Sequence, residues 1–582
     1  MEVQVGMFVR SKASHMLVGM ITLGVATLIY GCVANAQIQA NSPKYSEVKP
    51  VHDIAVVNLT VLSKCTQADT IPIMITVENR GSFPESFDVE LTDVTNDKKI
   101  GTKSVTLSGT DQREADADLT FSGEASGKQQ FGDWLAVGNV NGDGCADLLV
   151  SAAVHDNDRG RAYLYHGGEN MDNNVDRIFE GEIAGDYFGD GGGYLADMNK
   201  DGFDDVIIGA RYFDDRGRVY LFYGGPDMDI KPDIIFEPEE GVIGSSFGRG
   251  VAAGDLNGDG YNDLIVSAPL SDKNRGCAYL FFGGELFDTT IDKVFVSEGP
   301  SNAFGAVRSA RGDVDGDGYN DLLIGTRYGP NRSVRARGCV YLFYGAPGTE
   351  MDTKFDIIFE GENDRDEFGT EVDLFDIDND GHADVIVSAR RWNNGEGRVY
   401  LFWGSDRNAM DNVPDMYING EPDAREAFGG DHVVAGYAND DPYGDIVVPA
   451  FDYYRFSQHG RTYLFHGGTR SSIDNICDQT FTGANPGNLT MDARIADFNG
   501  DNRGDIVIGG WGYPNNTKQG RVWLYYGGAP CSTSITFNWD TTTTTPGKHT
   551  LQAAIAPVAG EADLADNSVT VEVEVKDSDN DG

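Results

Sequence analysis

A short acidic segment recurs at an almost constant interval along this chain of 582 residues, and it limits the fold more than any other feature. The copy GDVDGDGYNDLLIG, residues 312–325, places four aspartates within nine positions, directly before an apolar run. A fixed period of this kind predicts seven structural repeats of about 60 residues each. The segments begin at Asn139, Asp197, Asp255, Asp313, Asp376, Tyr437 and Asp497, and successive starts are 58, 58, 58, 63, 61 and 60 residues apart.

Each repeat carries the pattern of four short β-strands. A Phe-Gly pair precedes the acidic segment in six repeats, and an apolar stretch such as DLIVSAP (263–269) follows it. A glycine turn and an aromatic stretch such as RGRVYLFYGG (216–225) come next, before a last stretch such as DIIFEPE (233–239). The alternation and the β-branched content indicate strands. Four strands per repeat predict an all-β chain whose main domain, residues 115–529, is a seven-bladed β-propeller.

The ends of this region indicate how the ring closes. Residues 117–124, ADLTFSGE, look like the fourth strand of a repeat but precede the first one. The seventh repeat has three strands and then stops at Gly527-Gly528. We therefore expect the early strand to complete the last sheet, which removes two exposed sheet edges.

The spacing within the acidic segment predicts a calcium site. In a tight hairpin loop, side chains at positions 1, 3, 5 and 9 and the carbonyl at position 7 can converge, and glycine at position 6 permits the turn. Carboxylates this close repel one another unless a cation neutralises them. An all-oxygen, irregular cage suits Ca²⁺ better than Mg²⁺, and zinc prefers Cys and His side chains. The loop is not an EF-hand, because position 12 is apolar, as at Ile324.

We expect about six Ca²⁺ ions, although Asp, Asn and Gly also form ordinary turns. Four loops follow the pattern strictly, and they start at Asp197, Asp255, Asp313 and Asp376. With the loops numbered 1 to 7 in chain order, loop 1 starts with Asn139 and loop 7 has Asn502 at position 6. In loop 6, Tyr437 and Pro442 replace the first ligand and the glycine, so no ion is expected there. The predicted ligands are Asn139, Asn141, Asp143, Cys145 and Asp147; Asp197, Asn199, Asp201, Phe203 and Asp205; Asp255, Asn257, Asp259, Tyr261 and Asp263; Asp313, Asp315, Asp317, Tyr319 and Asp321; Asp376, Asp378, Asp380, His382 and Asp384; and Asp497, Asn499, Asp501, Arg503 and Asp505.

The N-terminus has the pattern of a targeting segment. Basic residues precede an apolar stretch, 16–30, that is short for a membrane span, and Ala-Asn-Ala at 34–36 reads as a cleavage site. We expect a signal peptide over 1–36. The alternatives are a lipoprotein signal to 31 with a lipid anchor on Cys32, or an uncleaved anchor. Each places the protein outside the cell or at its surface, and no later segment predicts a transmembrane helix.

The acidic composition fits a soluble surface, a cation-loaded protein, or both. The formal net charge of −47 argues against nucleic acid and anionic membranes as partners. Six cysteines follow the signal, and their spacing predicts neither a metal site nor a disulfide scaffold. These cysteines are Cys65, Cys145, Cys277, Cys339, Cys477 and Cys531.

The order Phe-Gly, D-x-[DN]-x-D-G-x-x-D, then an apolar strand ending in SAP or GAR resembles the FG-GAP repeat of integrin α-subunits, which also occurs in prokaryotic surface proteins. The resemblance spans the repeat region and implies a seven-bladed propeller with Ca²⁺ in its hairpin loops. It also implies adhesion or protein binding on a propeller face. No inserted adhesion domain lies between the repeats and no integrin-type membrane helix follows them, so a eukaryotic integrin partner is not implied.

The flanks of the propeller predict one further domain. Stretches between 50–110 and between 531–576 read as seven strands, the number in an immunoglobulin-like β-sandwich. The phrases ITVENRG and ADLADNSVTVEVEV resemble the CARDB module, an adhesion-related sandwich of bacteria. The propeller would then be inserted in a sandwich loop; two separate small β-modules are the alternative. Residues 577–582, DSDNDG, read either as the start of a type 3-like calcium repeat or as a solvated acidic tail.

The sequence predicts a protein without catalytic activity. The G-x-S-x-G match at 244–248 has no following helix, and no HExxH occurs. We expect an extracellular calcium-binding propeller that acts in cell adhesion or in binding a protein or glycan ligand at the cell surface. The alternative is a carbohydrate-binding module of a larger secreted enzyme or surface assembly, with aromatics such as Trp392, Trp511 and Tyr453-Tyr454 stacking on sugars.

Overall fold

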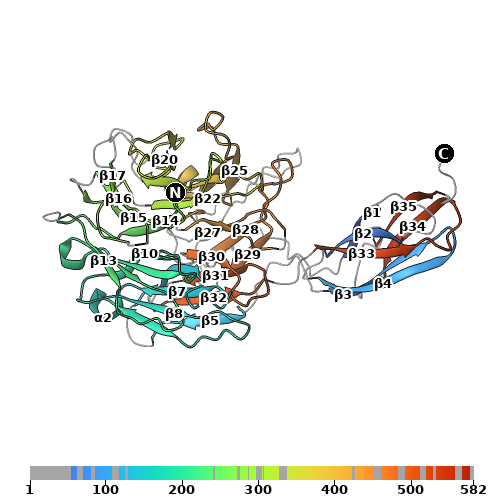
Figure 1. The fold of residues 1–582 in the computed structure, drawn as a ribbon, viewed down its shortest axis with the longest axis horizontal. Coiled ribbons are helices and arrows are strands. Elements are labelled where there is room, and N and C mark those ends of the chain that lie inside the picture. Colours follow the sequence, from blue (N-terminus) through green and yellow to red (C-terminus); the bar gives the residue numbers. More distant parts are fainter. Residues whose placement is uncertain are drawn as a thin grey trace, which may run out of the picture. The chain divides into compact units, whose positions relative to one another are not determined.

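The computed structural model shows an all-β chain whose strands form separate sheets (Figure 1). It describes residues 54–61, 70–79, 85–107, 117–124, 129–239, 243–271, 275–285, 287–296, 304–305, 307–326, 337–421, 427–430, 432–439, 441–450, 460–482, 492–510, 519–527, 532–556 and 567–576. The predicted signal peptide, Cys32, Cys65, Cys531, Trp511, Tyr453-Tyr454 and the acidic tail lie outside these residues. Within them, no helix is long and apolar enough to cross a membrane.

The described part of the repeat region forms seven antiparallel four-stranded sheets. In order along the chain, they are β6 (Phe131–Gly138), β7 (Asp147–Ala152), β8 (Arg161–Tyr165) and β9 (Arg177–Glu180); β10 (Phe188–Ala196), β11 (Asp205–Ala210), β12 (Arg218–Phe222) and β13 (Ile234–Phe236); β14 (Gly250–Gly254), β15 (Asp263–Ala268), β16 (Cys277–Phe281) and β17 (Lys293–Val296); β18 (Val307–Gly312), β19 (Asp321–Thr326), β20 (Cys339–Phe343) and β21 (Ile357–Glu360); β22 (Phe368–Phe375), β23 (Asp384–Ala389), β24 (Arg398–Phe402) and β25 (Met416–Asn419); β26 (Val434–Gly436), β27 (Asp445–Ala450), β28 (Arg461–Phe465) and β29 (Gln479–Thr482); and β30 (Asp492–Ala496), β31 (Asp505–Gly510) and β32 (Arg521–Tyr525) with β5 (Leu119–Ser122). Short helical turns α2 (His155–Asp158), η1 (Phe213–Asp215) and α4 (Trp392–Gly395) follow three of the second strands.

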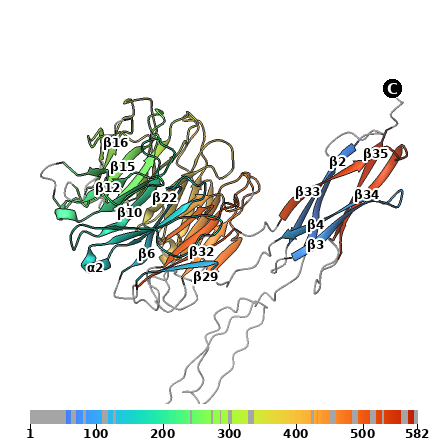
Figure 2. The same cartoon turned by 60° about the horizontal axis from the view of Figure 1, so that its bottom comes forward.

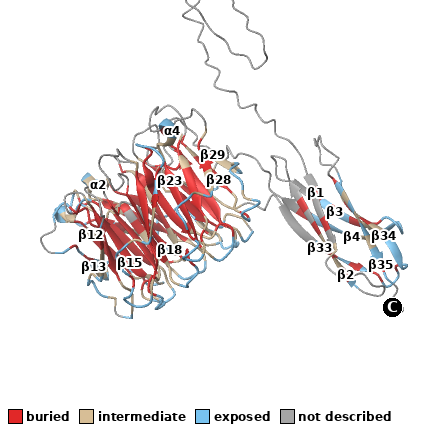
Figure 3. Cartoon of the chain, turned by 90° about the horizontal axis from the view of Figure 1, so that it is seen from above, coloured by how far each residue is buried: buried red, intermediate tan, exposed pale blue. Residues whose placement is uncertain are grey.

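The sheets form a β-propeller. The first strands contact one another in cyclic order, β6, β10, β14, β18, β22, β26, β30 and β6 again. The second strand of every sheet is buried along its whole length, as the red interior strands of Figure 3 show. Such burial on both faces explains why these strands read as unbroken apolar runs after their leading aspartate.

The last sheet is completed by the strand that precedes the first repeat, as the sequence predicts. Strand β5 pairs with β32 in the register Ser122↔Arg521 to Leu119↔Leu524, and its label lies beside β32 in Figure 1. The contact between the last and first sheets then repeats the contact between the others. Phe131 pairs with Gly520 as Phe247 pairs with Gly217.

The Phe-Gly pair joins neighbouring sheets. Each phenylalanine is buried and packs on the tyrosine of the aromatic strand in its own sheet, as Phe247 does on Tyr279 at 5.5 Å between ring centroids. Its backbone lies against a glycine of the preceding sheet. A Cβ on Gly217, whose φ is +95°, would lie 2.0 Å from the carbonyl oxygen of Phe247. Only glycine fits this turn, which explains the glycine before each aromatic strand.

The inner strands enclose a cavity of about 160 Å³. Four of the charged or titratable residues that line it form two pairs with one another. Arg311 donates to Asp373 through Nε at 2.9 Å, and His432 Nδ1 lies 3.5 Å from Glu371 Oε2. The Trp134 ring packs edge-on against His432, with 4.1 Å between centroids.

Strands from both flanks of the propeller share two further sheets. Blue and red strands lie side by side there in Figures 1 and 2. One sheet has the order β1-β2-β33 and the other the order β35-β34-β3-β4, and side chains of both form one hydrophobic core. The strands are β1 (Ile54–Val61), β2 (Thr70–Asn79), β3 (Glu85–Asp93), β4 (Lys98–Leu107), β33 (Ser532–Asp540), β34 (Gly547–Ile555) and β35 (Ser568–Val575).

Candidate metal centres

The seven acidic loops occupy the same connection in every sheet, between its first and second strands. Position 9 of each loop is also the first residue of the buried second strand. We number the loops 1 to 7 in chain order, from the loop between β6 and β7 to the loop between β30 and β31. The repeat spacing therefore places chemically equivalent side chains at structurally equivalent points.

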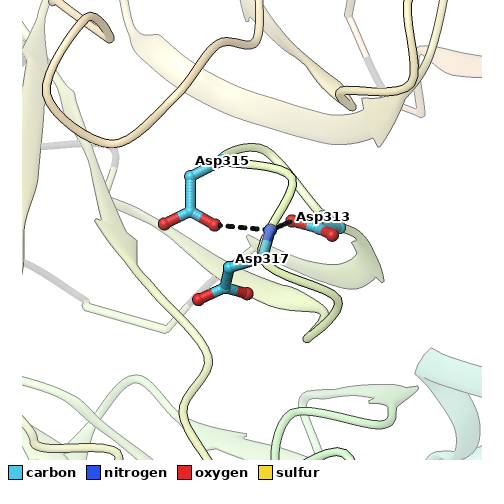
Figure 4. A group of neighbouring side chains, drawn as sticks. All are labelled: Asp313, Asp315 and Asp317. Carbon is cyan, nitrogen blue, oxygen red and sulfur yellow. Dashed lines mark hydrogen bonds between the residues drawn. The ribbon is translucent and has the colours of Figure 1, made fainter.

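Loop 4 brings three of its four aspartates together (Figure 4). Carboxylate oxygens of Asp313, Asp315 and Asp317 lie within 4.8 Å of one another. Asp313 also accepts hydrogen bonds from the N–H groups of Gly316 and Gly318, both at 2.7 Å. The chain is thus wrapped around the carboxylate at position 1, which orients the three side chains.

Loop 5 gathers a slightly different set. Carboxylate oxygens of Asp376, Asp378 and Asp384 lie within 4.8 Å of one another, so positions 1, 3 and 9 meet there. The Oδ1 atom of Asp378 is buried and has no hydrogen-bond partner. A buried, unpaired carboxylate oxygen beside two other carboxylates fits a hard cation, because a cation would supply the missing partner.

The remaining predicted loops share the same backbone arrangement. In loops 1, 2, 3 and 7 the asparagine at position 3 accepts the N–H of position 5, at 2.9 Å in each. The position 5 carboxylate accepts the N–H of position 7 in all six predicted loops. The position 7 residues are Cys145, Phe203, Tyr261, Tyr319, His382 and Arg503.

The aspartate at position 9 has a second role that the spacing did not indicate. It is fully buried in all seven loops, and each of its oxygens accepts a backbone N–H. Asp321 accepts from Val314 at 2.7 Å and from Gly345 at 2.8 Å, so it joins the loop to the end of the third strand. Equivalent pairs of bonds are made by Asp147, Asp205, Asp263, Asp384, Asp445 and Asp505. Loop 6, for which no ion is predicted, keeps this arrangement, so the two backbone hydrogen bonds of position 9 do not depend on the full set of predicted ligands.

Burial affects the ionisation of these aspartates. It raises the pKa of Asp205 and Asp263 to about 7, of Asp321 and Asp384 to about 8, and of Asp505 to about 6, although the backbone N–H groups oppose the shift. A divalent cation in the loop would favour the ionised form and lower each pKa. The donor set therefore fits a bound cation.

Loops 1 and 6 differ from the other five in the residue that follows the aromatic strand. Both lack aspartate at position 1, and in both a histidine follows the aromatic strand. His466 Nδ1 lies 3.1 Å from Asp445 Oδ1, and His166 Nδ1 lies 3.2 Å from Asp147 Oδ1. The Asp147 carboxylate raises the pKa of His166; burial opposes this for His466, but Asp445 outweighs it and the pKa is raised.

The other chemically notable side chains are occupied within the fold. Tyr437 packs on Phe375, with 5.0 Å between ring centroids. One face of Trp392 is covered by the Arg398 guanidinium at 3.6 Å, and its Nε1 donates to Glu362 at 3.2 Å. The four described cysteines, Cys145, Cys277, Cys339 and Cys477, are free thiols.

Comparison with known proteins agrees with the repeat pattern. The FG-GAP repeat family matches residues 131–165, 193–222, 247–281, 307–343 and 368–402. Integrin alpha pat-2 of Caenorhabditis elegans is 33% identical over 222 residues, which are 34% of this chain and 18% of that protein. Integrin alpha-5 of Xenopus laevis is 32% identical over 226 residues, 36% of this chain and 21% of that protein. The chain thus spans about a fifth of the length of these relatives.

Two solved structures are also similar, at 12% identity. They are the Dos1 propeller, with a TM-score of 0.37 over 84% of this chain and 92% of that one, and Chaetomium thermophilum Sqt1, with 0.40 over 71% and 98%. Neither likeness bears on function. The chain contains FG-GAP repeats, and integrin alpha subunits are among its homologues.

Proposed function

We propose that this protein is a non-catalytic, calcium-stabilised adhesion or ligand-binding protein outside the cell. The observation that carries the proposal is the recurrence of carboxylate-rich loops at one equivalent connection in the FG-GAP sheets. Integrin α-subunits, which the repeat region resembles, use such propellers in adhesion. The proposal includes a seven-bladed propeller and a CARDB-like, immunoglobulin-type sandwich, residues 50–110 with 531–576, into which the propeller is inserted.

In this proposal six loops hold Ca²⁺ through the side chains at positions 1, 3, 5 and 9 and the carbonyl at position 7. Each carboxylate oxygen can accept more than one interaction, so Asp321 can bind an ion and keep its two backbone hydrogen bonds. The ion would remove the repulsion among carboxylates and stiffen the hairpin that links the first two strands of each sheet. The chain's own residues supply the ligand-binding surface, through the connections that differ most between repeats.

The ligand is a protein or a glycan at the cell surface, with secretion by the signal peptide or anchoring through Cys32. Mature protein, residues 37–582, is used to capture partners from the organism's surface fraction, once with calcium and once with EDTA. We expect a protein captured only with calcium. Capture of the same proteins in EDTA and calcium would contradict a calcium-dependent adhesion role.

Carbohydrate binding is the second candidate, and a glycan array separates it from the first. Binding to one glycan class that is lost in the Trp392→Ala variant would favour a carbohydrate-binding module. The intramolecular stacking of Arg398 on Trp392 covers one ring face, which favours the protein ligand.

A further inference from the structure

Two arginines reach from one sheet into the acidic loop of the preceding sheet. Arg407, between β24 and β25, donates from Nε to Asp315 at 2.6 Å and from Nη2 to Asp317 at 3.1 Å. Arg470, between β28 and β29, makes the same two contacts with Asp378 and Asp380. In both cases the arginine bridges positions 3 and 5 of a predicted calcium loop.

The arginines occur only where the loop has an additional carboxylate. Position 3 is aspartate in loops 4 and 5 alone, and it is asparagine in the other five loops. The facing position is the third residue after the glycine that hydrogen-bonds to position 9. It is arginine only at 407 and 470, which face loops 4 and 5. At the aligned sequence positions that correspond to loops 1, 2, 3, 6 and 7, the chain has Asp227, Leu286, Gly348, Pro530 and Asn170, of which Leu286 and Pro530 lie outside the described residues.

The structure supports this correspondence in a loop without the arginine. The N–H of Gly348 donates to the carbonyl of Asn257 at 3.2 Å, so position 348 faces position 3 of loop 3. Loops 2, 3 and 7 each carry three aspartates among positions 1, 3, 5 and 9, whereas loops 4 and 5 carry four. One arginine beside a four-aspartate loop gives it the same formal charge as a three-aspartate loop.

Each arginine is held in place by an aromatic ring of the sheet that carries the loop. The Arg407 guanidinium lies 4.4 Å from the Tyr344 ring centroid, and that of Arg470 lies 5.6 Å from Trp403. Arg470 also donates to the carbonyl of Gly404 at 3.1 Å. The aspartates at position 3 are almost fully buried, with side chains 1% and 2% exposed for Asp315 and Asp378.

The contacts leave room for an ion. Arg470 uses the Oδ2 atoms of Asp378 and Asp380, whereas Oδ1 of Asp378 is buried without a partner. The guanidinium therefore lies beside the carboxylate group and does not occupy all of its oxygens. Planar guanidinium suits this bridging role better than the point charge of lysine.

We propose that Arg407 and Arg470 are positioning residues that compensate the additional buried carboxylate of loops 4 and 5 and thereby link these calcium sites to the next sheet. This inference rests on the proposed calcium sites. Without the arginine, the loop in the absence of calcium would carry an uncompensated buried charge, and its stability would depend more strongly on the ion.

The test is a double-mutant cycle on melting temperature, measured by calorimetry with EDTA and with saturating calcium. We expect Arg407→Gln to lower the melting temperature by about 3 °C in EDTA and by less than about 1 °C in calcium. Adding Asp315→Asn to Arg407→Gln reproduces the composition found in loop 3, and we expect it to restore the wild-type value in EDTA. Arg398→Gln, which removes another arginine that stacks on an aromatic ring, serves as the matched control and should act equally in both buffers.

The inference would be overturned if Arg407→Gln lowered the melting temperature equally in EDTA and in calcium and Asp315→Asn did not restore it. Arg407 would then contribute only by packing on the Tyr344 ring. Arg470→Gln provides an independent copy of the experiment in loop 5. Asn257→Asp provides the converse, because it adds a carboxylate to a loop that no arginine faces, and it should lower the melting temperature in EDTA. A wild-type protein whose melting temperature is the same in both buffers would overturn the proposed calcium sites themselves.

Discussion

The backbones of Gly520 and Phe131 form a parallel β-bridge. Gly520 lies in the last glycine turn of the repeat region, and Phe131 belongs to its first Phe-Gly pair. The same bridge joins Gly217 to Phe247 and Gly397 to Phe428 in the interior of the region. The ring is thus closed by the contact that also holds its neighbouring sheets together, and the glycine at this contact is open to a direct test.

Replacing Gly217 by alanine should destabilise the propeller by about 3 kcal/mol or more, because the new Cβ would meet the Phe247 carbonyl and the residue has a positive φ. Gly225→Ala is the matched control, since Gly225 also has a positive φ, of +125°, but nothing lies within 4 Å of its Cβ position. Chemical denaturation measures the free energy of unfolding of both variants. Equal losses would show that conformation, and not the sheet contact, requires glycine.

Calcium should stabilise the protein in proportion to the number of occupied loops. At a tenfold excess of free calcium over the dissociation constant, each site adds about 1.4 kcal/mol, so six sites add about 8 kcal/mol. Dissociation constants of extracellular sites are roughly 10⁻⁴ to 10⁻³ M, so millimolar calcium is required. Calorimetry in calcium and in EDTA checks this, with magnesium as the control cation. Equal melting temperatures in calcium and in EDTA would contradict the proposed calcium sites.

Asp321→Asn and Asp445→Asn separate the two roles of position 9. Each variant places an amide N–H₂ against a backbone N–H donor in a buried site, so we expect both to lose about 2 kcal/mol in EDTA. Only Asp321→Asn should also lose part of the calcium response, because loop 6 is not predicted to bind an ion. Unchanged stability of Asp445→Asn in EDTA would contradict the structural role of position 9.

His166→Tyr should strengthen calcium binding by loop 1. The His166 imidazole next to Asp147 carries part of the positive charge that an ion would otherwise supply. Without the imidazole, the Asp147 carboxylate is free to bind the cation. Equilibrium dialysis at a fixed, sub-saturating calcium concentration should show up to one additional ion per chain. His466→Tyr is the control, because no ion is predicted for loop 6, which has Tyr437 and Pro442 at positions 1 and 6. A gain in His466→Tyr alone would contradict this explanation.

The buried aspartates predict an inverted pH dependence in EDTA. The folded-state pKa values of Asp205, Asp263, Asp321, Asp384 and Asp505 lie at about 6 to 8, above the ordinary value of 3.8. Between these limits the folded protein binds more protons than the unfolded chain, so the free energy of unfolding falls as pH rises. We expect the melting temperature in EDTA to decrease from pH 5.5 to pH 8.5.

Saturating calcium should oppose this trend, because the ion holds the carboxylates ionised, and the difference between the two buffers should widen with pH. The decrease in EDTA should be smaller in Asp321→Asn, which lacks one of the titrating groups. A melting temperature in EDTA that rises over this range would show that these aspartates are not protonated in the folded protein.

The sequence was a good guide to the strands, to the close approach of carboxylates inside a loop and to the closure of the ring. The period predicted the four strands, and the Asp-x-Asn/Asp-x-Asp-Gly spacing predicted that Asp313, Asp315 and Asp317 approach one another in loop 4, although it placed Asp321 in the same group. The completion of the last sheet by residues 117–124 followed from an extra strand before the first repeat. These features depend on local patterning, which a single chain displays many times over.

Side-chain contacts between neighbouring repeats were not predicted, because they join residues that are far apart in sequence. Arg407 lies 92 positions from Asp315 and belongs to the next repeat. The bond of Asp321 within its own repeat was missed as well, because the glycine that it reaches is 24 positions away. A signal for the arginines was nevertheless present. When the repeats are aligned, an arginine stands three residues after the glycine that hydrogen-bonds to position 9 only where the preceding loop has aspartate at position 3. The alignment also shows that His166 and His466 occur only beside loops without aspartate at position 1.

The pairing of β5 with β32 sets the timing of assembly during synthesis. The hydrogen bond from Tyr526 to Asp118 spans 408 positions, so the first strand of the ring must wait for nearly the whole propeller to be translated. At ordinary translation rates of roughly 5 to 20 residues per second, that delay is about 20 to 80 s. The nascent chain therefore exposes an unpaired edge for most of its synthesis, and premature termination before β32 leaves that edge free to aggregate.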